Sequence, residues 1–208
     1  MKRIVALFGL LVAGLAIGPL PSVEAEPSTP VVVALGDSLT QGAGVTPEEA
    51  WPNLLAIKTG WVVVNGGVNG DTSEAALRRL PSLLEQHNPV LVLVTLGGND
   101  MLRHVPEQQT ITNLEKMIIL IKTDGAKPVL LATPNPSPMR AVFQILTAPD
   151  FYREIAEEQH VPLIEDAIGE VISDPKLKGD PLHPNAAGHV RLVDKIYKEL
   201  QSIGYAGL

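Results

Sequence analysis

The sequence contains no cysteine among its 208 residues. This absence excludes thiolate catalysis, disulfide frameworks and cysteine-ligated metal sites. An excess of positive charge is also missing, because the formal net charge is −7, which argues against affinity for nucleic acid or anionic membrane surfaces. The sequence has no internal repeat and no low-complexity tract. It also lacks the Gly-Lys-Ser/Thr ending of a phosphate-binding loop and the Gly-x-Gly-x-x-Gly motif of dinucleotide-binding proteins. What remains is the composition and length of one globular domain.

The start of the chain has the pattern of a secretory signal peptide. Lys2 and Arg3 precede an apolar run from Ile4 to Ile17, and small residues precede a predicted cleavage site after Ala25. An uncleaved membrane anchor is the alternative, although the run is short for a full span. We therefore expect a periplasmic or secreted protein in which residues 26–208 form one domain.

Short apolar runs alternate along the chain with segments of helical period. Val31–Leu35 is continuous and β-branched, as expected for a strand that is buried on both faces. Regular alternation of strands and helices predicts a parallel sheet covered by helices on both faces. The other expected strands are Trp61–Asn65, Val90–Leu96, Pro128–Thr133 and Val161–Ile164, and the expected helices are Glu48–Lys58, Ser73–Gln86, Thr112–Lys122 and a last helix from Asn185 or Ala186 to about Ile203.

Polar, glycine-rich segments follow three of the expected strands. These segments are Gly36–Ser38, Gly66–Ser73 and Gly97–Asp100. Ligands of open parallel sheets bind at the carboxyl ends of the strands. The sequence therefore predicts that three separate loops converge on one rim of the sheet.

Ser38 is a candidate nucleophile at this rim. A catalytic serine needs an exposed hydroxyl, a base within hydrogen-bond reach and donors for the oxyanion that it creates. Asp180 stands three residues before His183, so its carboxylate can turn back to the ring Nδ1–H and leave Nε2 free for the serine proton. The alternative is structural: Ser38 caps a helix, Asp180 forms a turn and His183 marks the entry to the last helix.

Two further residues are candidate oxyanion donors. Gly70 has no side chain to block a substrate from its N–H, and Asn99 carries an amide in a loop where two glycines allow close approach. A helix-capping turn around Gly70 and an ordinary turn asparagine at position 99 are the alternatives, and Asp100 is interpreted as structural. Metal chemistry is not expected, because His189 lies six residues beyond His183 and faces another side of the helix.

Together these segments resemble the SGNH (GDSL) hydrolase family, which is named for a serine, a glycine, an asparagine and a histidine in four blocks. The resemblance extends over essentially all of residues 31–203 and is strongest to the bacterial thioesterase/lysophospholipase/arylesterase branch. The four blocks are Gly36-Asp37-Ser38-Leu39, Gly70 within Asn69–Ser73, Gly97-Gly98-Asn99-Asp100 and Asp180-Pro181-Leu182-His183-Pro184-Asn185.

The resemblance implies a three-layer α/β/α, flavodoxin-like fold with five parallel strands, and catalysis without a metal or organic cofactor. Ser38 would attack the acyl carbon, His183 would act as base and then as acid, and Asp180 would orient His183. The oxyanion would be bound by the N–H groups of Ser38 and Gly70 and by the amide of Asn99.

The acyl group is less well defined by the sequence. Met101, Leu102 and Met139 are apolar and either border an acyl pocket or pack locally. The expected substrate is a small-molecule acyl ester or thioester. We expect a monomer that has no nucleic-acid partner and no stable membrane insertion after signal cleavage. A carbohydrate O-acetyl esterase is the alternative, disfavoured because Trp51 and Trp61, the two tryptophans, are expected in the core rather than in a sugar cleft. A binding module without turnover is disfavoured because every catalytic position is present.

Overall fold

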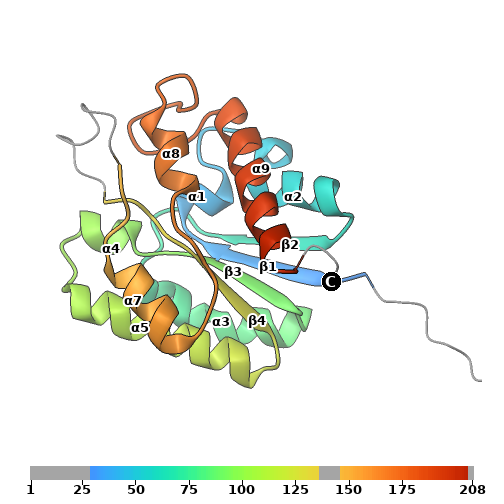
Figure 1. Ribbon diagram of the computed structural model, residues 1–208, viewed down its shortest axis with the longest axis vertical. Helices are drawn as coiled ribbons and strands as arrows, with labels where there is room; N and C mark the ends of the chain where they lie inside the picture. Colours follow the sequence, from blue (N-terminus) through green and yellow to red (C-terminus); the bar gives the residue numbers. More distant parts are fainter. Residues whose placement is uncertain (1–28, 136–145, 206–208) are drawn as a thin grey trace, which may run out of the picture.

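The computed structural model describes residues 29–135 and 146–205 (Figure 1). The predicted signal peptide and Met139 lie outside these residues. Within them, five strands form one all-parallel sheet in the order β2-β1-β3-β4-β5, which is the flavodoxin-like doubly wound order. The strands are β1 Val31–Gly36, β2 Val62–Gly67, β3 Leu91–Thr95, β4 Lys127–Leu131 and β5 Leu163–Ile164.

Helices cover both faces of the sheet and complete three layers, as Figure 1 shows. In β1, Val32 and Ala34 pack into one core cluster and Val33 and Leu35 into the other, because successive strand residues point to opposite faces. The first cluster lies under α2, α8 and α9, and the second lies under α3, α5 and α7. The predicted three-layer α/β/α fold is confirmed. These helices are α2 Trp51–Thr59, α3 Ser73–His87, α5 Glu107–Thr123, α7 Phe151–Gln159, α8 Ala167–Ser173 and α9 Ala186–Ser202.

Two helix starts differ from the prediction. The helix expected from Glu48 begins at Trp51, because the preceding Pro47–Glu49 forms a separate 3₁₀ turn, η1. The helix expected from Thr112 begins at Glu107, since its first turn is polar and exposed and contributes nothing to hydrophobic periodicity.

The chain direction places the candidate site at the point where the strand order reverses. β2 and β3 pair with opposite edges of β1, so a crevice opens beyond the carboxyl ends of β1 and β3. Two short helices begin there: α1, Ser38–Gln41, follows β1, and α4, Gly98–Leu102, follows β3. Ser38 and Asn99 therefore follow the carboxyl ends of two neighbouring strands, β1 and β3. In the described part of the chain, no helix has both the length and the apolar character needed to cross a membrane.

Candidate active site

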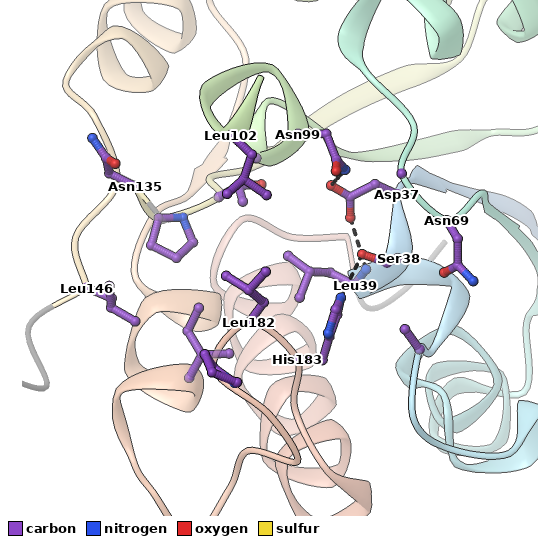
Figure 2. Close-up of a pocket in the computed structure, with 17 residues that line it drawn as sticks. Asp37, Ser38, Leu39, Asn69, Asn99, Leu102, Asn135, Leu146, Leu182 and His183 are labelled. Carbon is purple, nitrogen blue, oxygen red and sulfur yellow. Dashed lines mark hydrogen bonds between the residues drawn. The ribbon is translucent and has the colours of Figure 1, made fainter. Parts of the chain in front are cut away.

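Ser38 is the first residue of α1, but the helix is capped by another side chain. Asp37 is the N-cap residue, and its Oδ1 accepts a hydrogen bond of 2.9 Å from the N–H of Leu39. The interpretation of Ser38 as the capping residue is therefore wrong. The Ser38 hydroxyl instead lies 2.9 Å from Nε2 of His183, 145 residues further along the chain (Figure 2).

Asp180 holds the histidine from its other side. Asp180 Oδ2 lies 2.8 Å from Nδ1 of His183, while Oδ1 accepts from the backbone N–H groups of Leu182 at 2.7 Å and His183 at 2.9 Å. The carboxylate thus forms the turn and orients the ring at once. The Nδ1–H donates to the carboxylate in this arrangement, which leaves Nε2 as the acceptor that faces Ser38.

The charge on Asp180 is stabilised where it lies. Desolvation by partial burial pushes the pKa of Asp180 upward, but hydrogen bonds from the His183 side chain and from the Leu182 and His183 N–H groups outweigh it. The net effect lowers the pKa of Asp180 below its ordinary 3.8. The carboxylate is therefore ionised at neutral pH, as a partner for an imidazolium must be.

The loop that carries this pair is anchored at its base. The Asn185 amide donates to the carbonyl oxygens of Lys176 and Lys178, and its oxygen accepts from the N–H of Gly188 as the N-cap of α9. Lys178 and Pro184 form an antiparallel bridge across the loop. The start of α9 thus fixes the position of His183.

Gly70 occupies a tight turn after β2. Its φ of +74° is the left-handed conformation that favours glycine, and the N–H of Asp71 closes the turn on the carbonyl of Val68 at 3.0 Å. Arg103 Nη2 donates to the Gly70 carbonyl at 2.7 Å. Among the described residues, the Gly70 N–H has no hydrogen-bond acceptor, so it is available to a ligand.

Asn99 lies in the first turn of α4 and uses one amide N–H inside the protein. Its Nδ2 donates to Asp37 Oδ2 at 3.0 Å, as the dashed line in Figure 2 marks. Asp100 is buried and accepts from both the N–H and the hydroxyl of Ser73, at 2.8 and 2.5 Å. This contact agrees with the structural interpretation of Asp100, since it ties the α4 segment to the start of α3.

A cavity of about 700 Å³ opens beside these groups. Leu102 lines it, whereas its neighbour Met101 is partly buried and is not among the described lining residues. Its walls combine the polar groups of the site with apolar side chains, and Figure 2 shows Leu102 and Leu182 facing the space near Ser38. The apolar part of the lining includes Leu39, Leu102, Pro134, Leu146, Ile172 and Leu182.

Two buried polar residues near the site were not predicted. Asp37 is only 2% exposed and contacts Asn99, and His189 is fully buried with Nδ1 accepting from the Trp51 N–H at 3.2 Å. In the sequence, Asp37 differed from an ordinary turn residue only by its place beside Ser38.

Within residues 29–135 and 146–205, no three histidine, aspartate or glutamate side chains gather as a metal site.

A doubly wound sheet with a serine, a histidine and an aspartate in hydrogen-bonded sequence at its carboxyl edge has the features of a hydrolase. Comparison with known families agrees. Residues 34–191 match the GDSL-like Lipase/Acylhydrolase family, and the chain belongs to that family. It is a hydrolase of ester bonds.

Individual relatives span most of the chain. It is 37% identical to an arylesterase of Vibrio mimicus over 81% of this chain and 87% of the relative. It is 38% identical to thioesterase 1/protease 1/lysophospholipase L1 of Escherichia coli K12 over 83% of this chain and 84% of the relative. Among solved structures, the psychrotrophic esterase EstA of Pseudoalteromonas sp., inhibited by monoethylphosphonate, matches with a TM-score of 0.73 and 30% identity, over 83% of this chain and 97% of that one.

Proposed function

We propose that the protein is an exported enzyme that hydrolyses acyl esters or thioesters through an acyl-enzyme on Ser38. The observation that carries the proposal is the continuous contact from Ser38 Oγ to His183 Nε2, at 2.9 Å, and from His183 Nδ1 to Asp180 Oδ2, at 2.8 Å. This is the arrangement in which a histidine can take a serine proton while a carboxylate stabilises the imidazolium.

In the acylation step, Ser38 Oγ forms a bond to the acyl carbon as its proton passes to His183 Nε2. The carbonyl π electrons move to the oxygen and give a tetrahedral oxyanion. When this intermediate collapses, the bond to the leaving alcohol or thiol breaks, and His183 returns the proton to the leaving atom. Asp180 keeps its negative charge throughout and holds the ring.

The oxyanion is bound by donors from the three loops at the rim. They are the N–H of Ser38 at the start of α1, the N–H of Gly70 and the amide N–H of Asn99 that is not used on Asp37. The first N–H groups of a helix lack intrahelical acceptors and so are free for a ligand. One such donor typically lowers the barrier by roughly 3 kcal/mol.

In deacylation, water takes the place of the leaving group. His183 removes a proton from the water as its oxygen bonds to the acyl carbon, and then protonates Ser38 Oγ as the ester bond to the serine breaks. The products are a free carboxylic acid and the regenerated hydroxyl. No step requires a metal or an organic cofactor.

The cavity favours an acyl chain longer than acetyl. Its volume of about 700 Å³ and its leucine-rich lining lie next to the nucleophile, and cavities of roughly 300–1,000 Å³ are those that enclose organic ligands. The names of the two curated relatives, an arylesterase and a thioesterase/lysophospholipase, are consistent with an acyl ester or thioester.

The test is hydrolysis of p-nitrophenyl esters from acetyl to palmitoyl. We expect kcat/KM to be higher for medium or long chains than for acetyl, and Ser38→Ala to abolish turnover. The same substitution at Ser82, an exposed hydroxyl on α3, is the matched control and should leave activity unchanged. Activity on acetyl alone would favour the sugar O-acetyl esterase instead, and full activity of Ser38→Ala would refute the assignment.

Export is tested separately. Expression of the full chain in a bacterial host should give activity in the periplasm or medium, with a mature N-terminus that begins at Glu26. An intact Met1 on cytoplasmic or membrane-bound enzyme would contradict this part of the proposal.

A further inference from the structure

Asp37 is a buried carboxylate that the proposed reaction does not use. It lies between β1 and the nucleophile, is 2% exposed, and has both oxygens engaged. Oδ1 accepts from the Leu39 N–H at 2.9 Å, and Oδ2 accepts from Asn99 Nδ2 at 3.0 Å (Figure 2). The second contact joins the first loop of the rim to the third, across 62 residues of sequence.

Capping α1 does not explain why this residue is charged. A neutral serine, threonine or asparagine caps a helix about as well as an aspartate, and α1 has only four residues. Burial raises the pKa of Asp37 to about 6, although the Leu39 N–H, the charge of His183 and the Asn99 amide all act to lower it. The fold therefore keeps a charge where desolvation opposes it, which directs attention to the contact made by the second oxygen.

The carboxylate selects one of the two orientations of the Asn99 amide. An ionised carboxylate has only acceptors, so it forms a hydrogen bond with the NH₂ group of the amide and repels its carbonyl oxygen. Rotation of the amide by 180° would place oxygen against Asp37 and would turn the carbonyl, in place of N–H, toward the cavity. One N–H held by Asp37 also fixes the direction of the other, because the amide group is planar.

We propose that Asp37 is a positioning residue that holds the Asn99 amide with its second N–H directed at the oxyanion. This role rests on the proposed function, in which Asn99 is an oxyanion donor. Asp37 itself touches neither the substrate nor the reacting atoms in this proposal. It acts on the rate through Asn99 alone.

The experiment is a double-mutant cycle on p-nitrophenyl ester hydrolysis with Asp37→Asn, Asn99→Ala and the double variant. Asp37→Asn keeps the shape of the side chain, but the new amide has only one acceptor oxygen. It can therefore accept from Leu39 or from Asn99, and it presents its NH₂ group to the other. We expect kcat to fall roughly 10- to 100-fold, a fraction of the loss for a missing oxyanion donor, with little change in KM. In the Asn99→Ala background the same substitution should change kcat by about twofold or less.

Asp37→Ser separates capping from positioning. Serine retains an N-cap oxygen for α1 but is too short to reach Asn99, so it should lose kcat as Asp37→Asn does while its melting temperature stays near that of the wild type. It also keeps the test available if Asp37→Asn does not fold.

Three outcomes would overturn the proposal. The first is an equal loss from Asp37→Asn in both backgrounds, which would mean that Asp37 acts independently of Asn99. The second is full activity of Asp37→Ser. The third is full activity of Asn99→Ala, which would remove the oxyanion donor that Asp37 is proposed to hold. Failure of the proposed function would be visible earlier, as absence of ester hydrolysis by the wild type or its persistence in Ser38→Ala.

Discussion

Burial of His189 should lower the free energy of unfolding at acidic pH. This ring is fully buried on α9, and its Nδ1 accepts a hydrogen bond from the backbone N–H of Trp51. Nδ1 must be unprotonated to accept this bond. Burial lowers the pKa of His189 from 6.5 to about 4; the charge of His183 adds to the lowering, whereas Glu49 opposes it. The folded protein therefore keeps this histidine neutral at a pH where the unfolded chain protonates it.

The sign and size of the effect follow from proton linkage. Between pH 6.5 and about 4 the unfolded chain binds a proton at position 189 that the folded chain does not bind. The free energy of unfolding therefore falls as the pH falls through this window. At about 1.4 kcal/mol per pKa unit, the loss by pH 4 is about 3 kcal/mol.

A second buried group acts in the opposite direction. The pKa of Asp37 is raised by burial from 3.8 to about 6, so the folded chain binds this proton first, and its contribution to the free energy of unfolding rises as the pH falls from 6 to 4. Its size is again about 3 kcal/mol. The wild-type profile alone therefore hides both effects, and only a comparison with a variant isolates His189.

The variant is His189→Gln, whose amide oxygen can accept from Trp51 but does not titrate. Urea unfolding followed by the fluorescence of Trp51 and Trp61, both buried in the core, gives the free energy of unfolding at pH 7 and pH 4. The stability advantage of the wild type over the variant should shrink by about 3 kcal/mol between the two pH values. His87→Gln, at the partly exposed end of α3, is the matched control. A constant advantage would refute the reasoning, because it would mean that His189 titrates alike in the folded and unfolded chains.

Other changes test separate parts of the site and of the fold. Asn99→Ala should lower kcat about a hundredfold or more with little effect on KM, measured by steady-state ester hydrolysis; an unchanged kcat would count against the oxyanion donor. Asp180→Asn should lower kcat on the order of a thousandfold, because the imidazolium loses its carboxylate, and near-wild-type activity would exclude the orienting role. Gly97→Ala should destabilise the fold by about 2 kcal/mol or more in urea unfolding, since its φ is +115° and an added Cβ would lie 2.3 Å from the Tyr152 hydroxyl; an unchanged stability would show that the turn relaxes.

The parts of the fold that could be predicted are those marked by a local pattern of residues along the sequence. Val31–Leu35 is apolar at every position because β1 is buried on both faces, and that run is readable without neighbours. The convergence of Ser38, Gly70 and Asn99 also followed from sequence, because the carboxyl ends of parallel strands share one edge. The Asp180–His183 contact spans only three residues, so its geometry was within reach of the local pattern.

The parts that could not be predicted depend on long-range contacts. Nothing local marks His189 as buried, because its partner, the Trp51 N–H, lies 138 residues away. Asp37 reads as a turn aspartate until α4 brings Asn99 against it. α7 was not predicted, and its buried face of Phe151, Tyr152, Ile155 and Ala156 packs in the same core cluster as residues of α5 and the sheet.

Covalent trapping tests the role of Ser38 most directly. The full chain is incubated with a p-nitrophenyl alkylphosphonate, which transfers its phosphonyl group to a nucleophilic oxygen as p-nitrophenolate leaves. We expect one equivalent of p-nitrophenolate per chain, loss of ester hydrolysis, and a single mass adduct that peptide mapping places on Ser38. Ser38→Ala should remain unlabelled, and Ser82→Ala should label as the wild type does. An adduct on another residue, or continued hydrolysis after Ser38 is fully labelled, would contradict Ser38 as the nucleophile.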